Sequence, residues 1–241
     1  MQNLFIFEAM MKRYLMVCAC FFVGKLALAQ KPEIQIGVQT GIAIPRGEFA
    51  SGYGLYIENG YAATGYNYKV YTEVRLKNAF CIGINYLNFT NGLEAGNLYA
   101  GFNNIFTTIN PVVNHKYETN AILGSLMFKG KETPLFIKGY AGFGTSKSAE
   151  ITGSNTTASA TLLQSTSDLS LVYGFAMGIY LPIKNKFFIE IEGDYIISSG
   201  RPGNITIINN NTKETFQEGS ISYNPTVINI NIGVGLFLFR E

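Results

Sequence analysis

The stretch Thr226-Val-Ile-Asn-Ile-Asn-Ile-Gly-Val-Gly-Leu-Phe-Leu238 decides the fold class, because from Ile228 onward every second residue is aliphatic. The residues between them are Asn229, Asn231, Gly233, Gly235 and Phe237. Successive side chains of a β-strand point to opposite faces, so the stretch predicts a strand with one apolar face and one polar or small face.

Seven more segments show the same alternation. It is clearest in residues 33–44 and 169–181, while residues 117–128 have mixed faces and predict a β-bulge near Gly124. The eight predicted strands are residues 33–44, 66–76, 80–87, 117–128, 135–143, 169–181, 187–197 and 226–238.

The composition agrees with a β-structure. Only 14% of the 241 residues are charged and 47% are hydrophobic, against roughly 25% charged in an average soluble domain. The chain has 26 Gly, 15 Tyr and 18 Phe, which favour turns and strands. A disordered chain and a helical bundle are therefore excluded.

The connections between the predicted strands alternate in length. Short turns of about 3 to 6 residues follow loops of more than about 20 residues that are rich in Asn, Gly, Ser and Thr. An even number of antiparallel strands with short turns at one end and long loops at the other is typical of outer-membrane barrels. We predict an all-β, eight-stranded, antiparallel up-and-down transmembrane β-barrel with both termini on the periplasmic, short-turn side.

The N-terminal segment has the pattern of a secretory signal peptide. Lys12 and Arg13 precede an apolar run that ends in Ala27-Leu28-Ala29, a small-x-small cleavage site. We predict a cleaved signal peptide over residues 1–29 and an outer-membrane barrel domain over residues 30–241. A membrane anchor is the alternative, but Lys25 interrupts the run well short of about 20 residues. Lipidation at Cys20 and translation from Met10 or Met11 also stay open.

Removal of residues 1–29 leaves 15 basic and 15 acidic residues and one cysteine, Cys81. A neutral chain gives no electrostatic basis for binding nucleic acid. A single cysteine forms no internal disulfide, so the sheet itself must hold the domain together.

Alternation alone leaves open which face of the barrel points outward. A soluble lipocalin-like carrier directs its apolar face inward and its charged face to water. Here the non-apolar face is crowded with glycines, and residues 169–181 have no charge, which suits a narrow lumen and a lipid-facing exterior. Aromatic residues expected at the membrane interfaces are Tyr66, Tyr68, Tyr86, Phe187 and Tyr195.

Charged residues on the inward face predict a structural ion network, because an unpaired charge in a narrow lumen is costly. Its basic members are Lys69, Arg75, Lys77 and Lys138, and its acidic members are Glu73, Glu190, Glu192 and Asp194. Their formal charges cancel. Arg75 is the first candidate for the partner of Glu192, since its planar guanidinium can hold two carboxylate oxygens. Solvated charges on the exterior of a soluble barrel are the alternative.

The chain resembles the small OmpA/OmpX-like outer-membrane barrels, including the PorT-like group. The resemblance rests on the leader ending Leu26-Ala27-Leu28-Ala29-Gln30, the eight strands and the closing run Val227 to Phe239. It implies assembly by the barrel-assembly machinery. Such proteins usually end in an aromatic residue, whereas Arg240 and Glu241 follow Phe239 here, which leaves the assembly signal uncertain.

The search for chemistry finds no catalytic, cofactor-binding or metal-binding site. His115 is the only histidine, and neither a serine triad nor a metal-ligand spacing surrounds it. A lipid A deacylase would place a serine close after the histidine, but the next one is Ser125. We therefore predict no enzyme, no cofactor and no metal.

Two classes of function remain. The first is an outer-membrane protein with a structural, adhesion or partner-docking role, whose contacts are membrane lipid and an envelope or surface protein. The second is a small-solute or ligand transporter or carrier. An eight-stranded lumen is filled by side chains, so we expect no open pore.

Overall fold

The eight segments of alternating sequence form eight long strands in a computed structural model of the chain. These strands are β1 (Glu33–Pro45), β2 (Ala62–Lys77), β3 (Phe80–Leu93), β5 (Tyr117–Lys129), β6 (Leu135–Lys147), β9 (Asp168–Ile183), β10 (Phe187–Ser198) and β13 (Thr226–Phe237). Each contains most or all of a predicted segment and extends several of them by a few residues.

The structure describes residues 33–50, 62–77, 79–94, 110–113, 116–130, 133–149, 151–154, 158–164, 168–184, 186–199, 204–209, 215–220 and 224–238. The predicted signal peptide, His115, Arg240 and Glu241 lie outside these residues. So does the side chain of Lys77, although its backbone belongs to β2.

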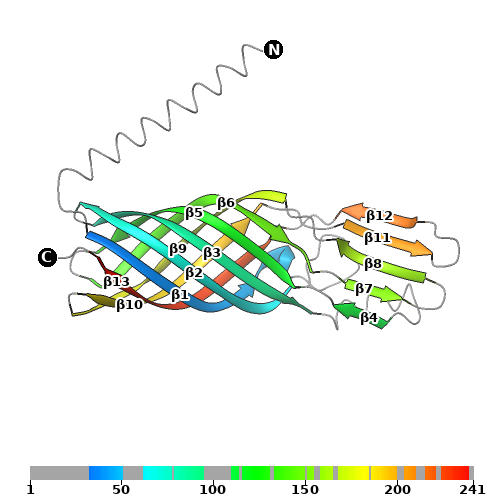
Figure 1. Ribbon diagram of the computed structural model, residues 1–241, viewed down its shortest axis with the longest axis horizontal. Helices are drawn as coiled ribbons and strands as arrows, with labels where there is room; N and C mark the ends of the chain where they lie inside the picture. Colours follow the sequence, from blue (N-terminus) through cyan, green and yellow to red (C-terminus); the bar gives the residue numbers. More distant parts are fainter. Residues whose placement is uncertain are drawn as a thin grey trace, which may run out of the picture.

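Within this part of the chain the long strands close into a barrel in the order β1-β13-β10-β9-β6-β5-β3-β2 (Figure 1). Every neighbouring pair is antiparallel, and β1 pairs with β13 without a break from Gln35 opposite Phe237 to Pro45 opposite Val227. The predicted eight-stranded antiparallel up-and-down barrel is confirmed.

The predicted bulge near Gly124 is wrong. Strand β5 pairs with β3 and with β6 in an unbroken register. Its faces appear mixed in the sequence because Leu123 and Met127 point inward, into apolar parts of the lumen. Within the described barrel strands, the register breaks lie in β2, between Ala63 and Tyr66 and between Arg75 and Lys77.

A second sheet, which the sequence analysis missed, stands beyond one end of the barrel (Figure 1). Three of the long connections supply its strands, in the order β12-β11-β8-β7-β4. The bounds are β4 (Asn110–Val113), β7 (Ile151–Ser154), β8 (Ala158–Gln164), β11 (Asn204–Asn209) and β12 (Thr215–Ser220). We call this end of the molecule the sheet end, and the opposite end, where β1 begins and β13 ends, the terminal end.

The outer face of the barrel is apolar and the inner face holds the polar side chains. Ile84, Leu126 and Leu169 are 67%, 69% and 77% exposed, whereas Lys69, Glu192 and Asp194 are almost completely buried. A soluble carrier would show the reverse arrangement. No helix in the described residues is long and apolar enough to cross a membrane.

Candidate functional site

The lumen of the barrel is filled in three zones. Near the terminal end lie aromatic and sulfur-containing side chains, with the Tyr180 and Phe188 rings stacked 4.6 Å apart. Charged side chains follow, and a second apolar cluster extends toward the sheet end. The charged zone is where the predicted ion network would lie.

Lys69 on β2 is one centre of this charged zone. Its Nζ donates hydrogen bonds to Glu192 Oε1, to Asp194 Oδ2 at 2.9 Å and to the Tyr140 hydroxyl oxygen at 3.0 Å. The ammonium also lies 4.7 Å from the centroid of the Tyr140 ring. These contacts join β2 to β10 and β6 through the lumen.

Lys138 on β6 is the second centre. Its Nζ lies 2.8 Å from Glu73 Oε1, 3.2 Å from Glu192 Oε2 and 3.5 Å from Glu190 Oε1. The Tyr71 ring centroid is 4.9 Å from the same nitrogen. Glu192 therefore lies between both lysines and binds each with a different carboxylate oxygen.

Neutral polar groups complete the surroundings of the four carboxylates. Tyr71 donates to Glu190, and Tyr140 donates to Glu192 Oε1 at 2.9 Å. The remaining donors are Gln35 to Glu73 at 2.6 Å, Asn229 to Asp194 at 2.6 Å and Asn231 to Asp194 at 2.9 Å. Each buried carboxylate thus has both a cation and a neutral donor, which offsets much of the cost of burying its charge.

The structure brings together six of the eight residues that were expected in the network: Lys69, Glu73, Lys138, Glu190, Glu192 and Asp194. Arg75 lies elsewhere, at the terminal end of β2, where Nη1 is 2.9 Å from Glu33 Oε2. The expectation that Arg75 pairs with Glu192 is wrong, because Arg75 lies six residues along the strand from Lys69, well away from the level of Glu192. The side chain of Lys77 is outside the described residues.

This placement changes the charge balance that was expected. The described ion cluster has two lysines and four carboxylates, so the formal charges within this cluster do not cancel. The neutral donors Gln35, Tyr71, Tyr140, Asn229 and Asn231 were also missed. Their signal was present, since all five occupy inward positions of alternating strands.

Glycines on the inner wall make room for large rings on the neighbouring strand. A Cβ added to Gly178 would lie 2.5 Å from the Phe136 ring, and one added to Gly235 would lie 2.1 Å from the Phe188 ring. In each pair the two residues face each other across adjacent strands. The aromatic rings at the terminal end therefore fit in the lumen only because the facing residues are glycines.

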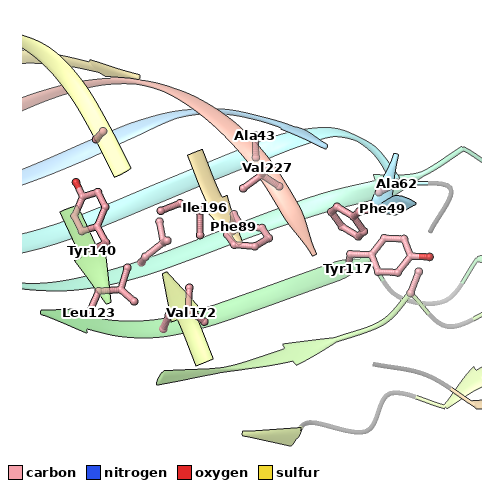
Figure 2. Packing of buried hydrophobic residues seen from close by; sticks show 14 residues of the cluster. Ala43, Phe49, Ala62, Phe89, Tyr117, Leu123, Tyr140, Val172, Ile196 and Val227 are labelled. Atoms are coloured by element: carbon pink, nitrogen blue, oxygen red, sulfur yellow. The ribbon is translucent and has the colours of Figure 1, made fainter. Parts of the chain in front are cut away.

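Another aromatic contact lies at the sheet end of the lumen. After β1 the short 3-10 helix η1 (Gly47–Phe49) buries Phe49 completely, and its ring meets Tyr117 edge-on at 5.2 Å (Figure 2). Below it, hydroxyl groups form a continuous hydrogen-bonded row of Thr119, Ser146, Ser198 and Ser170, with oxygens 2.9 to 3.0 Å apart. Buried side chains are thus present near both ends of the lumen and between them.

The charged side chains of this arrangement hold strands of the barrel together. The lysines and carboxylates of the cluster are buried and bound to one another. Among the described residues, no group of three or more His, Cys, Asp or Glu side chains could hold a metal ion. Surfaces open to other molecules are the outer wall of the barrel and its two ends.

Comparisons with solved structures match outer-membrane barrels at low sequence identity. A major outer membrane protein of Thermus thermophilus has 10% identity and a TM-score of 0.48, over 85% of this chain and 99% of that one. Neisserial surface protein A has 10% identity and a TM-score of 0.46, over 86% and 99%. Ail, the attachment invasion locus protein of Yersinia pestis, has 15% identity and a TM-score of 0.41, over 86% and 97%.

No protein-family model matches the sequence, and no curated protein matches it significantly. Membership of the OmpA/OmpX-like or PorT-like group stays a prediction.

Proposed function

We propose that this chain is an outer-membrane protein whose barrel spans the bilayer and whose sheet end presents a surface for structural, adhesion or partner-docking contacts. The observation that carries the proposal is the exposed apolar outer wall of a closed barrel. Water would not favour such a wall, whereas lipid would, and closure leaves the spanning sheet no unpaired edge.

Aromatic residues support this placement at two levels of the outer wall. Phe80 and Phe128 pack at 5.2 Å near the terminal end, and Phe187 is exposed there too. Tyr68 and Tyr86 lie 5.9 Å apart farther along the barrel. Aromatic girdles of this kind flank the apolar band of transmembrane barrels.

The filled lumen favours docking over transport. Phe49 is buried at the sheet end, and the stacked rings of Tyr180 and Phe188 lie at the terminal end. A solute would have to displace the buried ion cluster to pass. The part of the molecule with freedom to contact a partner is the sheet of β4, β7, β8, β11 and β12, which extends beyond the barrel (Figure 1).

Fractionation and gel mobility test the location. We expect the protein in outer-membrane fractions, with a folded form that migrates differently from the boiled form. The predicted signal peptide would direct this export, and the barrel-assembly machinery would insert the chain. Recovery as a soluble periplasmic protein would contradict the proposal and favour the soluble carrier.

Two further measurements separate docking from transport. The purified barrel should give no steady conductance in planar bilayers, and an open channel would assign it to transport. Replacing residues 201–223, which include β11 and β12, by a short Gly-Ser turn should leave the heat-modifiable barrel intact. The same variant should lose a surface partner that the full chain captures from native envelopes.

A further inference from the structure

The two ends of the barrel differ in charge. Among the side chains that the structure describes, the terminal end has four basic residues, Arg75, Lys129, Lys184 and Lys186, and one acidic residue, Glu33. The sheet end has three basic and three acidic residues: Arg46, Lys116, Lys147, Glu48, Glu94 and Glu118. The described side chains therefore make the terminal end basic and leave the sheet end balanced in charge.

The turn between β9 and β10 presents the most accessible of these cations. Lys184 and Lys186 are both exposed, and Lys184 has a φ of 56°, a left-handed conformation typical of a tight turn. The one described acid at this end, Glu33, is bound to Arg75 at 2.9 Å. No described acidic side chain forms an ion pair with Lys184 or Lys186.

Exposed apolar residues lie directly beside these lysines in the sequence. Ile183 precedes Lys184 and is 43% exposed, and Phe187 follows Lys186 and is 57% exposed. The same order occurs at the end of β5, where exposed Phe128 precedes Lys129, whose ammonium lies over the Tyr180 ring. We call Arg75, Lys129, Lys184 and Lys186 the basic rim, and it begins where the apolar outer wall ends.

We propose that this basic rim binds the headgroups of anionic phospholipids in the leaflet that surrounds the terminal end. The inference rests on the proposed function, since the apolar wall must lie in the bilayer for the rim to reach a headgroup layer. A phosphate at that depth meets the ammonium groups, while the lysine stems stay against the acyl boundary. Charge complementarity and continuity with the apolar wall both favour lipid as the occupant.

The lipid preference of the inserted barrel tests the proposal. The full protein is inserted into phosphatidylcholine bilayers containing a small amount of spin-labelled phosphatidylglycerol or spin-labelled phosphatidylcholine. Spin resonance then gives the association constant of each labelled lipid with the barrel. Three proteins are compared: the unchanged chain, Lys184→Gln with Lys186→Gln, and the matched sheet-end control Lys116→Gln with Lys147→Gln.

We expect the unchanged barrel and the control to prefer phosphatidylglycerol. The Lys184→Gln, Lys186→Gln variant should lose up to about fivefold of that preference per lysine, the factor that corresponds to one cation near an anionic surface. About 1 M salt should suppress the preference of the unchanged barrel, since the screening length falls to about 3 Å.

Equal affinity of the unchanged barrel for both lipids would overturn the inference, and so would equal losses in the two double variants. Retention on lipid-free peptidoglycan without any phosphatidylglycerol preference would assign the rim to an anionic polymer instead. A heat-modifiable band that forms in pure phosphatidylcholine shows insertion independently of the rim. Failure to insert into either bilayer would overturn the proposed function itself.

Discussion

The inner and outer faces of the barrel wall have opposite polarity, and consecutive residues of one strand alternate between them. In β10, Glu190 and Glu192 are 2% and 0% exposed and bind lysines, while Ile191 between them is 45% exposed on the outer wall. A shift of the strand by one residue would place both carboxylates outside and the isoleucine among the charges. The environment of a residue in this molecule depends on its face much more than on its position along the strand.

Removing a cation from the inner face should have the largest effect. Lys138→Met leaves Glu73, Glu190 and part of Glu192 without their cation, so we expect a loss of about 3 to 5 kcal/mol in the free energy of unfolding. Urea titration of the folded band on gels measures the loss.

Double-mutant cycles show whether this loss comes from the ion pairs. Glu192→Gln should couple with neutral substitutions at Lys69 and Lys138, and its effect should add simply to that of Arg75→Gln. Additive effects with all three basic residues would mean that water reaches the cluster and that the inner face is solvated.

A charge on the outer face should cost somewhat less. Ile191→Arg, in the middle of β10, is expected to destabilise the inserted barrel by about 2 to 4 kcal/mol. Phe175→Arg on the adjacent strand should behave similarly. The matched control is Leu169→Arg at the sheet end of β9, where the expected cost is about 0 to 1 kcal/mol. Equal costs at Ile191 and Leu169 would argue against a bilayer around the wall.

Crowding of the inner face should give an intermediate effect. Gly178→Ala brings a methyl group against the Phe136 ring and the Ile191 carbonyl oxygen, with an expected cost of about 1 to 3 kcal/mol. A second change, Phe136→Leu, should recover part of it. Gly139→Ala on the outer wall meets nothing within 4 Å and is the control, and its stability in urea should be unchanged.

The smallest effect is expected at the terminal end of the barrel, where the charged side chains are partly exposed. Arg75 and Glu33 are 30% and 18% exposed in their side chains, so water and salt screen their ion pair. Arg75→Gln should cost at most about 1 kcal/mol in low salt and less in high salt. A loss as large as that of Lys138→Met would place Arg75 in the buried network after all.

Most of the barrel was predictable because the two faces differ in polarity, which gives the sequence a period of two residues. The period of two survives in β1 and β9, where nearly all inward residues are small or polar. It weakens in β5, because Leu123 and Met127 face apolar zones of the lumen, and there the sequence suggested a bulge that does not exist. A strand pattern records which face a residue lies on without recording what it meets across the lumen.

The pairing of charges was less predictable for that reason. Contact between Lys69 and Glu192 depends on how far the strands are displaced along one another around the ring, and no short-range pattern specifies that displacement. The second sheet was missed because its strands are short and half of its strand pairs join different connections, as β8 does with β11 and β4 with β7. Asn, Ser and Thr in these segments read as loop residues until a partner strand completes the ladder.

The pairing of β1 with β13 has a consequence for how the molecule acquires its shape. The first and last strands of the ring form one of its ladders, and the contacts between them join residues from opposite ends of the chain. High contact order of this kind slows folding, and an open ring exposes two strand edges on which other chains can add. Until β13 is in place the ring cannot close, and its two open strand edges stay accessible to other chains.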